Sequence, residues 1–271
     1  MRVSFIKMHG LGNDFVVLDG RDTALPPLTG PFARALADRR TGIGCDQLIV
    51  LEPSAAATAR MRIFNPDGGE VEACGNATRA IGLLLGQAAT IETLGGLLEV
   101  APHPSGISVD MGEPRFEWDR IPLAYAMDTH TMPLAWDSLE NPTAVNVGNP
   151  HVIFFVPDCD AIELDRLGPE IEHDPLFPAR INVNVATLVD RGHIRLRVWE
   201  RGAGETLACG TGACATAIGA MRRGLVDRKV TVSLPGGDLL IEWTEAGRIM
   251  MTGPAVESFR GDFDPAAFGA A

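Results

Sequence analysis

The chain has 271 residues, of which 46% are apolar and 21% charged, a composition that supports packed cores rather than disorder. Its 35 acidic and 23 basic residues give a formal charge of −12, which would repel a phosphate backbone and makes nucleic acid an unsuitable partner. Five cysteines without regular close spacing argue against a secreted disulfide framework and against a zinc site, so no metal is expected.

No apolar stretch of the sequence has the length or pattern of a membrane-spanning segment or a signal peptide, so no membrane partner is expected. Residues 1–10 lack the apolar core of a signal peptide. The longest uncharged helical stretch, residues 208–221, is shorter than the ~20 residues that span a bilayer. We therefore expect a cytoplasmic protein whose cysteines stay reduced.

The first half of the chain predicts strands followed by one short helix. Apolar and polar residues alternate in the manner of strands at residues 14–18, 47–51 and 60–64. A glycine-rich turn then leads into a helix that begins at Cys74 and ends near Gly86, and a hairpin is expected at residues 90–100. The helix has one apolar face, which comprises Ala77, Ala80, Ile81, Leu84 and Leu85.

A stretch with several prolines and little periodicity, residues 115–142, is expected to link the two halves. The second half then predicts the same order of elements. Strand patterns appear at residues 152–156, 186–189 and 193–200, a helix at 209–221 and a hairpin at 229–243. The second helix is apolar on nearly every side, which is typical of a core helix surrounded by sheet. Arg222, Arg223 and Gly224 are typical of a helix carboxyl end.

Sequence motifs in the second half repeat those of the first. Residues 63–76 align without a gap with residues 198–211, so that Cys74 matches Cys209. The matched residues in these segments are Gly69, Glu70, Ala73, Cys74 and Gly75 with Gly204, Glu205, Ala208, Cys209 and Gly210. Upstream, residues 12–17 match residues 148–153, so the two matched segments follow each other in the same order in both halves. The repetition predicts a duplicated structural unit.

We therefore expect an α+β fold of two pseudo-symmetric domains, each a curled, mostly antiparallel and barrel-like sheet around a central helix. The first domain would comprise residues 1–116 and carry the Cys74 helix. The second would comprise residues 117–256 and carry the Cys209 helix, with residues 257–271 packing back onto the first.

The two matched cysteines are the strongest candidates for chemistry. Each is expected at a helix amino end, where unpaired N–H groups and the helix dipole favour an anion and lower the pKa of a thiol. Two halves related by an approximate two-fold axis would place Cys74 and Cys209 on opposite faces of one carbon atom. One thiolate could then remove a proton and the opposite thiol return one, which inverts a stereocentre. The remaining cysteines, Cys45, Cys159 and Cys214, are expected to serve packing.

The chain resembles the diaminopimelate epimerase family over nearly its whole length. The resemblance rests on specific motifs at residues 9–15, 42–47, 63–68, 71–76, 148–151, 181–183, 200–206 and 208–212. It implies a cofactor-independent epimerase that interconverts LL- and meso-2,6-diaminopimelate through a pair of cysteines. It also implies a homodimer and a place in the synthesis of lysine and cell-wall precursors.

The resemblance also implies roles for individual residues. Cys74 and Cys209 would act as proton donor and acceptor in one direction and exchange roles in the other, assisted by the polar neighbours His151 and Glu200. The substrate would be bound by Asn13, Gln47, Asn65, Gly75, Asn76, Asn149, Asn182, Glu200, Arg201, Gly210 and Thr211. Among these, Gly75, Asn76, Gly210 and Thr211 resemble the cradle for a carboxylate. Arg201 suits the distal carboxylate and Glu200 the distal ammonium group.

Other interpretations stay open at this stage. Turns, caps, strand ends and buried cores use the same side chains, so structural roles remain for Asn13, Asn65, Asn149, Gln47, Asn182, Glu200, Arg201 and His151. A cofactor-free racemase of the proline racemase or hydroxyproline epimerase type would also use two thiols, on a smaller substrate. A non-catalytic protein that binds amino acids is an alternative of another class.

Overall fold

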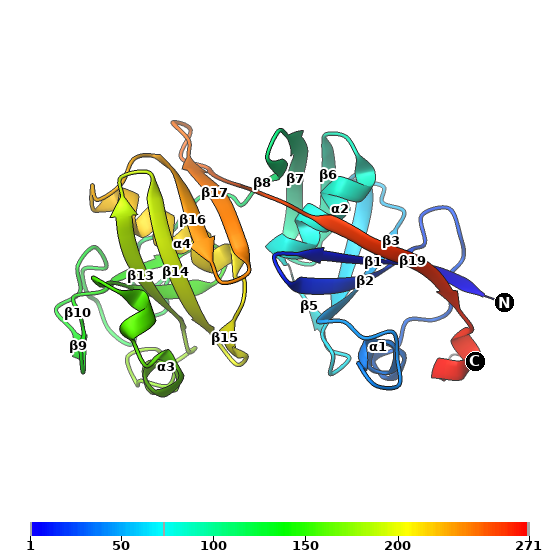
Figure 1. The fold of residues 1–271 in the computed structure, drawn as a ribbon, viewed down its shortest axis with the longest axis horizontal. Coiled ribbons are helices and arrows are strands. Elements are labelled where there is room, and N and C mark those ends of the chain that lie inside the picture. Colours follow the sequence, from blue (N-terminus) through cyan, green and yellow to red (C-terminus); the bar gives the residue numbers. More distant parts are fainter. Residues whose placement is uncertain (1, 73, 270–271) are drawn as a thin grey trace. The chain divides into compact units, whose positions relative to one another are not determined.

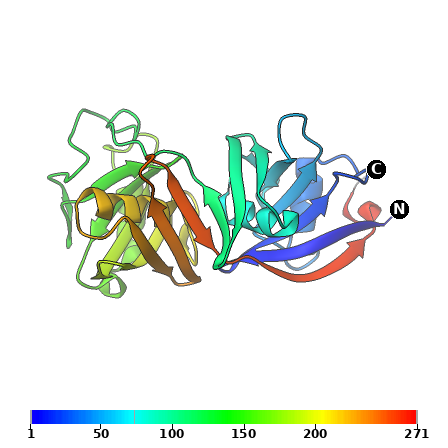
Figure 2. The same ribbon diagram turned by 90° about the horizontal axis from the view of Figure 1, so that it is seen from above.

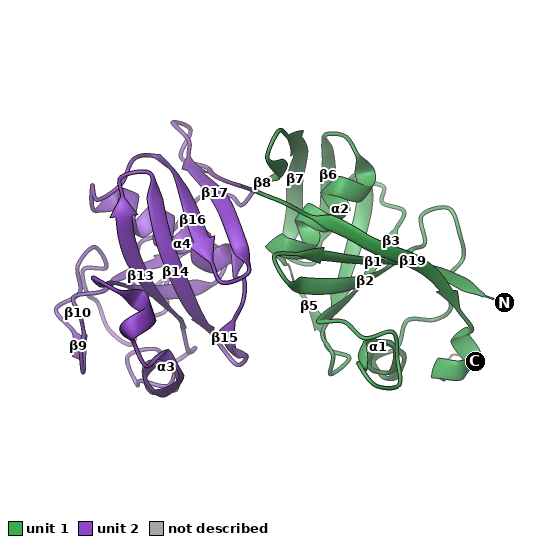
Figure 3. Ribbon diagram, viewed as in Figure 1, with its two compact units in different colours: residues 1–109, 253–271 green, residues 110–252 purple. Residues whose placement is uncertain are grey.

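The computed structural model describes residues 2–72 and 74–269, which form two compact units (Figures 1 and 3). Unit 1 consists of Met1–Val109 and Gly253–Ala271, and unit 2 of Asp110–Thr252. The sequence predicts the boundary between the two domains at residues 116 and 117, with residues 257–271 packing back onto the first domain. Ala73, which belongs to the repeated motif, lies outside the described residues, as do residues 1, 270 and 271 of the expected first domain.

The described residues of unit 1 form a curled sheet with two α-helices. Its elements in chain order are β1 (Val3–Gly10), β2 (Asn13–Asp19), α1 (Gly30–Ala37), β3 (Gln47–Glu52), β4 (Ala59–Phe64), β5 (Glu70–Val71), α2 (Gly75–Leu85), β6 (Ala89–Thr93), β7 (Gly96–His103), β8 (Gly106–Asp110), β19 (Val256–Phe263) and the 3₁₀ helix η2 (Pro265–Phe268). Strand β19, near the end of the chain, pairs antiparallel with β1 near its beginning (Figure 1). The last strand thereby closes onto the first within this unit.

Unit 2 repeats this layout with its own strands and helices. Its elements are β9 (Ala135–Trp136), β10 (Leu139–Glu140), β11 (Thr143–Asn146), β12 (Pro150–Phe155), η1 (Cys159–Ala161), α3 (Leu164–Glu172), β13 (Asn182–Asp190), β14 (His193–Glu200), β15 (Gly204–Thr206), α4 (Gly210–Arg222), β16 (Lys229–Leu234), β17 (Gly237–Trp243) and β18 (Ile249–Gly253).

The two units show the same order of strand pairings. The pair β2–β3 is parallel, as is β12–β13, and β4–β6 is parallel, as is β14–β16. The ladders β3–β4, β6–β7, β13–β14 and β16–β17 are antiparallel. Even the register agrees, since Phe15 stands opposite Gln47 in unit 1 and His151 opposite Asn182 in unit 2. The predicted α+β class, with mostly antiparallel sheet in two parts, is confirmed.

Helix α4 is the core of unit 2. All its residues from Gly210 to Met221 except Thr211 are buried. Figure 2 shows strands of the same unit on several sides of this helix, drawn in gold. Two glycines allow the close approach: a Cβ atom at Gly212 would lie 2.9 Å from Val198 of β14, and one at Gly219 would lie 2.7 Å from Thr143 of β11. The run of small residues that predicted a core helix therefore determines how closely the sheet surrounds it.

Both cysteine-bearing helices begin where the sequence predicted. Cys74 is the N-cap of α2 and Cys209 the N-cap of α4, each in an extended conformation just before the first helical residue. Helix α2 ends at Gly86, whose φ of 68° is left-handed and favours glycine.

The segment expected to be a linker is instead part of unit 2. Ile121, Leu123, Met132 and Leu139 are buried in one hydrophobic cluster of that unit. Residues 135–140 form the two-stranded hairpin β9–β10. The linker prediction is wrong because proline content and lack of periodicity report on irregular backbone and not on burial. Irregular chain can still place apolar side chains in a core.

Two further helices, α1 and α3, were not anticipated from the sequence. Helix α1 begins after Thr29, whose hydroxyl accepts from the N–H of Phe32, and buries Phe32 and Leu36. Helix α3 contains Pro169, a residue that normally argues against a helix interior. Within the described residues, no helix is both long and apolar enough to cross a membrane.

Candidate functional site

The Cys74 thiol of unit 1 lies beside a row of amides. Its sulfur is 3.8 Å from Oδ1 of Asn13, and the amide nitrogen of Asn76 donates to the same oxygen at 3.3 Å. The amide nitrogen of Asn13 donates in turn to Oδ2 of Asp46 at 3.1 Å. Asn13 is thus held between Asp46 and the entrance of α2, so its amide is oriented toward the cysteine.

A second amide pair lies at the start of β3 and just after β4. The side-chain nitrogen of Gln47 donates to Oδ1 of Asn65 at 3.1 Å. The other polar atom of Gln47, Oε1, is buried and has no hydrogen-bond partner among the described residues. A buried amide oxygen without a partner costs free energy unless a ligand or water satisfies it. Gln47 therefore offers an acceptor that suits a polar ligand.

In unit 2, a chain of contacts leads from Cys209 to His151. The Cys209 sulfur accepts from the N–H of Gly212 at 3.3 Å and lies 3.5 Å from Oγ1 of Thr211. The Asn149 amide nitrogen donates to that hydroxyl at 3.2 Å, and the Asn149 oxygen lies 3.0 Å from Nε2 of His151. Four predicted site residues are therefore joined through their side chains.

The remaining predicted residues of unit 2 lie at the ends of β13 and β14. Asn182 accepts from the backbone N–H of Arg201 at 2.9 Å and donates to the carbonyl of Pro150 at 2.8 Å. The Arg201 guanidinium is exposed and donates to the carbonyl of Ala179. The Glu200 carboxylate accepts from the hydroxyl of Thr206 at 2.6 Å. Asn182 thereby fixes the backbone from which Glu200 and Arg201 project.

The expectation that the helix end lowers the pKa of both thiols is wrong for Cys209. Burial raises the pKa of this thiol well above its ordinary value, and the negative charge of Glu200 raises it further. The Thr211 hydroxyl and the Gly212 N–H act in the opposite direction, but desolvation outweighs them. Cys209 is therefore a thiol, a proton donor, at neutral pH.

His151 is buried and uncharged near neutral pH. Complete burial lowers the pKa of its imidazole to about 4, although a hydrogen bond with Asn184 opposes this shift and the charge of Arg201 adds to it. A neutral imidazole carries one proton, so one ring nitrogen donates and the other accepts.

Three polar residues around the site were missed by the sequence analysis. Asn184 and Thr216 are fully buried beside His151 and α4, and Asp46 orients Asn13. A signal for Asn184 was present, because the alternation in residues 181–185 places Asn182 and Asn184 on the same face of a strand. Thr216 and Asp46 had no comparable signal, since only the fold brings them to their partners.

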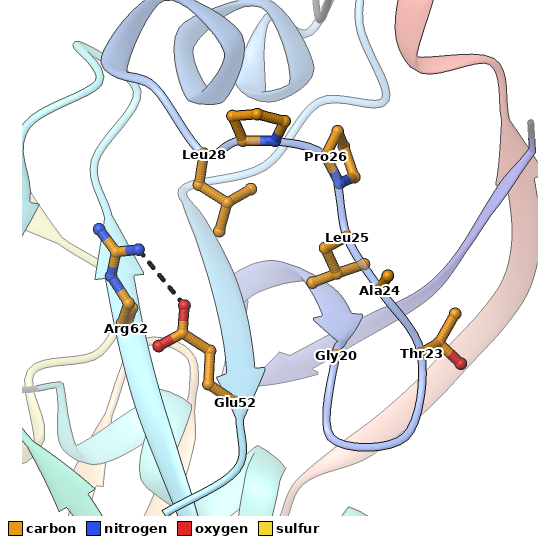
Figure 4. Close-up of a pocket in the computed structure, with 9 residues that line it drawn as sticks. Gly20, Thr23, Ala24, Leu25, Pro26, Leu28, Glu52 and Arg62 are labelled. Carbon is orange, nitrogen blue, oxygen red and sulfur yellow. Dashed lines mark hydrogen bonds and ion pairs between the residues drawn. The ribbon is translucent and has the colours of Figure 1, made fainter.

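A candidate metal cluster and a surface depression lie apart from the predicted residues. Asp158, Cys159 and Asp160 present ligand atoms within 4.8 Å of one another, but Arg195 pairs with both carboxylates and offsets part of their negative charge. A depression of about 280 Å³ in unit 1 is lined by residues 20, 23–28, 52 and 62 (Figure 4). Its charged groups, Glu52 and Arg62, are paired with each other, so we assign it no ligand.

The structure thus assembles the predicted residues in two groups, one in each unit. Unit 1 holds Cys74, Asn13, Gln47, Asn65, Gly75 and Asn76, and unit 2 holds Cys209, Asn149, His151, Asn182, Glu200, Arg201, Gly210 and Thr211. Each group has one cysteine at a helix entrance, beside neutral amide or hydroxyl groups, and Glu200 adds a negative charge near Cys209. The expected approach of the two sulfur atoms to one carbon stays a prediction.

Comparison with known proteins identifies the family. The family model described as Diaminopimelate epimerase matches residues 5–117 and 143–257. The chain is 67% identical over 264 residues to the diaminopimelate epimerase of Erythrobacter litoralis, which covers 97% of this chain and 98% of that relative. The chain belongs to the diaminopimelate epimerase family. It is also 54% identical over 269 residues to the diaminopimelate epimerase of Zymomonas mobilis, with 99% and 100% of the two chains covered.

Solved structures of other proteins share the fold of this chain at low sequence identity. A phenazine biosynthesis protein of the PhzF family from Bacillus anthracis matches with a TM-score of 0.70 at 18% identity, covering 97% of this chain and 99% of that one. A hydroxyproline epimerase from Agrobacterium vitis matches with a TM-score of 0.67 at 16% identity, covering 99% and 95%. At this identity the likeness concerns the fold alone.

Proposed function

We propose that the protein is a diaminopimelate epimerase that interconverts LL- and meso-2,6-diaminopimelate without a cofactor. The observation that carries the proposal is the matched pair of cysteines, each the N-cap of a helix and each beside neutral hydrogen-bonding side chains. Membership of the family supports the substrate, because relatives with that name match the whole chain at high identity.

The reaction requires one base and one acid on opposite faces of the α-carbon. One thiolate removes the α-proton and becomes a thiol, while the electron pair of the C–H bond stays on the substrate. The opposite thiol then transfers its proton to the other face of that carbon and becomes a thiolate. Cys209 suits the acid in one direction because burial keeps it protonated, and Cys74 then acts as the base. The roles exchange in the other direction.

The helix entrances supply the stabilisation that a carbanion adjacent to a carboxylate needs. The first N–H groups of α2 and α4, at Gly75, Asn76, Gly210 and Thr211, point out of their helices and suit the charge that develops on the carboxylate. Such donors are already oriented before the reaction and therefore cost little reorganisation.

The distal end of the substrate carries one carboxylate and one ammonium group, and two adjacent residues of unit 2 carry the opposite charges. The exposed guanidinium of Arg201 suits the distal carboxylate, and the carboxylate of Glu200 suits the distal ammonium group. The amides of Asn13, Gln47, Asn65, Asn149 and Asn182 suit the remaining polar atoms. Among them Gln47 has a buried acceptor that still lacks a partner in the described chain.

The family also supports several proposals about the setting of the enzyme. We propose a cytoplasmic homodimer that acts in the synthesis of lysine and cell-wall precursors. The proline racemase type remains the alternative within cofactor-free racemases, and its support is a shared fold at low sequence identity. A non-catalytic amino-acid-binding protein is the alternative of another class.

A substrate comparison tests the proposal. The purified protein, assayed under reducing conditions, should epimerise LL-diaminopimelate and leave L-proline and trans-4-hydroxy-L-proline unchanged. Racemisation of either ring substrate without reaction of diaminopimelate would support the proline racemase type instead. Binding of diaminopimelate without any inversion would support the binding protein.

A further inference from the structure

A fully buried polar cluster lies beneath the Cys209 helix entrance. Asn184 of β13 donates from its amide nitrogen to the carbonyl of Gly212 at 3.0 Å and to the hydroxyl of Thr216 at 2.8 Å. Its amide oxygen lies 3.2 Å from Nδ1 of His151. The side chains of His151, Asn184 and Thr216 all have no exposed surface. The cluster therefore connects β12, β13 and the first turns of α4.

The matching positions of unit 1 are apolar. The repeated motifs and the strand register align His151 with Phe15 and Asn184 with Ile49, and the helix motif aligns Thr216 with Ile81. All three residues of unit 1 are also completely buried. The same fold is thus built with a hydrocarbon core in one unit and a hydrogen-bonded cluster in the other. Because burying polar groups costs more than burying apolar ones, folding alone does not account for the cluster.

The orientation of the Asn184 amide is fixed by its partners. The carbonyl oxygen of Gly212 accepts hydrogen bonds but cannot donate them, so it must face the NH₂ group of Asn184. The amide oxygen then necessarily faces His151, and Nδ1 of that ring must carry a proton in order to donate to it.

We infer that Asn184 is a positioning residue that holds His151 as the Nδ1–H tautomer, with Nε2 unprotonated. This tautomer requires the Asn149 amide to be turned by 180° from the placement in which its oxygen lies 3.0 Å from Nε2, so that its NH₂ group donates to the ring. This inference rests on the proposed function only for its catalytic consequence. The tautomer itself follows from the hydrogen bonds within unit 2. The charged group that acts on the ring is Arg201, and the titratable Cys209 is connected to the ring through Asn149 and Thr211. Glu200 acts on Cys209.

The consequence concerns the proton on Cys209. An unprotonated Nε2 accepts from the NH₂ group of Asn149, which turns the Asn149 oxygen toward the hydroxyl of Thr211. That hydroxyl then donates to Asn149 and cannot at the same time donate to a Cys209 thiolate, whereas the thiol keeps Glu200 as a hydrogen-bond acceptor. A Cys209 thiolate is favoured by the reverse orientation of the Asn149 amide, which is the one described above for the site. There the Asn149 nitrogen donates to Thr211, Thr211 is free to donate to sulfur, and the Asn149 oxygen faces a protonated Nε2. Asn184 therefore favours the thiol form of Cys209.

Nitrogen NMR tests the tautomer directly. In wild-type protein labelled with ¹⁵N-histidine, long-range ¹H–¹⁵N correlations at pH 7.5 distinguish the two ring nitrogens of each of the six histidines. His151 is assigned by the signals missing from H151Q. We expect the Nδ1–H pattern for His151. An Nε2–H pattern, or a ring protonated on both nitrogens, would overturn the inference, and this measurement needs no substituted Asn184.

A pair of variants tests the link to Cys209. Asn184→Leu removes the acceptor for Nδ1–H, so His151 should shift toward the Nε2–H tautomer and the pKa of Cys209 should fall. Thr216→Val removes one partner of Asn184 but keeps the Gly212 carbonyl, so the tautomer and the Cys209 pKa should stay as in wild type. The pKa is read from the pH dependence of alkylation of Cys209, located by mass spectrometry. An unchanged pKa in N184L would overturn the coupling.

Activity separates this inference from the proposed function. N184L should lower kcat for diaminopimelate by about tenfold, the scale expected when one hydrogen bond worth about 1.4 kcal/mol is lost from the chain of side chains that leads to Cys209, with a smaller effect on KM. Wild-type protein that shows the Nδ1–H pattern but does not epimerise diaminopimelate would contradict the proposed function alone. Active wild-type protein with the other tautomer would contradict the inference alone.

Discussion

The hydroxyl oxygen of Thr211 lies 3.5 Å from the sulfur of Cys209 and 3.2 Å from the side-chain amide of Asn149. In unit 1, Asn76 holds the matching place two residues after Cys74 and shares the oxygen of Asn13 with that thiol. Each cysteine is thus followed, two residues later in the first turn of its helix, by a polar side chain. The neighbours differ, and the environment of Cys209 keeps it protonated.

Glu200 should keep Cys209 protonated through its negative charge. Because the carboxylate raises the pKa of this thiol, Glu200→Gln should lower that pKa and shift the alkylation profile of Cys209 to lower pH. Glu205→Gln is the matched control, since the charge of Glu205 is paired with Arg197, whereas Glu200 is the carboxylate that acts on Cys209. A profile that is the same in E200Q and wild type would contradict the charge interaction.

Thr211 should act in the opposite direction. Its hydroxyl lowers the pKa of Cys209, so Thr211→Val should raise that pKa and shift alkylation to higher pH. The turnover of diaminopimelate should fall by about tenfold, since a hydrogen bond to a charged group is worth roughly 1.5–3 kcal/mol and part of it is replaced by the Gly212 N–H. Thr211→Ser, which keeps the hydroxyl, should restore most of the rate; failure of this rescue would mean that packing is responsible.

The fold and the candidate site were predictable from the sequence to different extents. Cys74 and Cys209 were placed at helix entrances because glycine-rich turns and small-residue helices are local signals. The structure of residues 115–142 was missed, because burial of Ile121 and Met132 depends on contacts made far along the chain.

The electrostatics of the site were harder to anticipate than its composition. The helix end predicted a lowered pKa for Cys209, but the sequence gives no measure of how deeply strands surround α4. Desolvation depends on that depth and reverses the sign. The cluster of Asn184 and Thr216 could not be predicted for the same reason, since its members meet only once the sheet is formed around the helix.

Burial of neutral His151 should make stability depend on pH. Its pKa is lowered from 6.5 to about 4 in the folded protein, so the unfolded chain takes up a proton at a higher pH than the folded one. The resulting stability is present above pH 6.5 and is lost as the pH falls toward 4, by about 3 kcal/mol in total. Urea unfolding of wild type and H151Q between pH 7 and 4 measures the difference in slope. Equal slopes in both proteins would exclude this contribution.

Gly219 should be required for the close packing of α4. A Cβ atom there would lie 2.7 Å from Thr143, and a rigid β-branched neighbour cannot move away easily. Gly219→Ala gains up to about 1 kcal/mol in helix propensity, but overpacking costs roughly 1–3 kcal/mol. We expect net destabilisation of about 1 kcal/mol in urea unfolding. Gly192→Ala, where the nearest atom is an ordinary 3.5 Å away, should be neutral; equal effects in both variants would contradict the packing argument.

The action of two thiols on one α-carbon is tested most directly by proton NMR of LL-diaminopimelate in deuterated water. Wild-type enzyme should produce the meso form with deuterium at the inverted carbon. Cys74→Ala and Cys209→Ala should each abolish this product, whereas Cys214→Ala, which changes a thiol buried within α4, should retain activity. Deuterated meso product formed at a wild-type rate by either C74A or C209A would contradict the two-thiol mechanism.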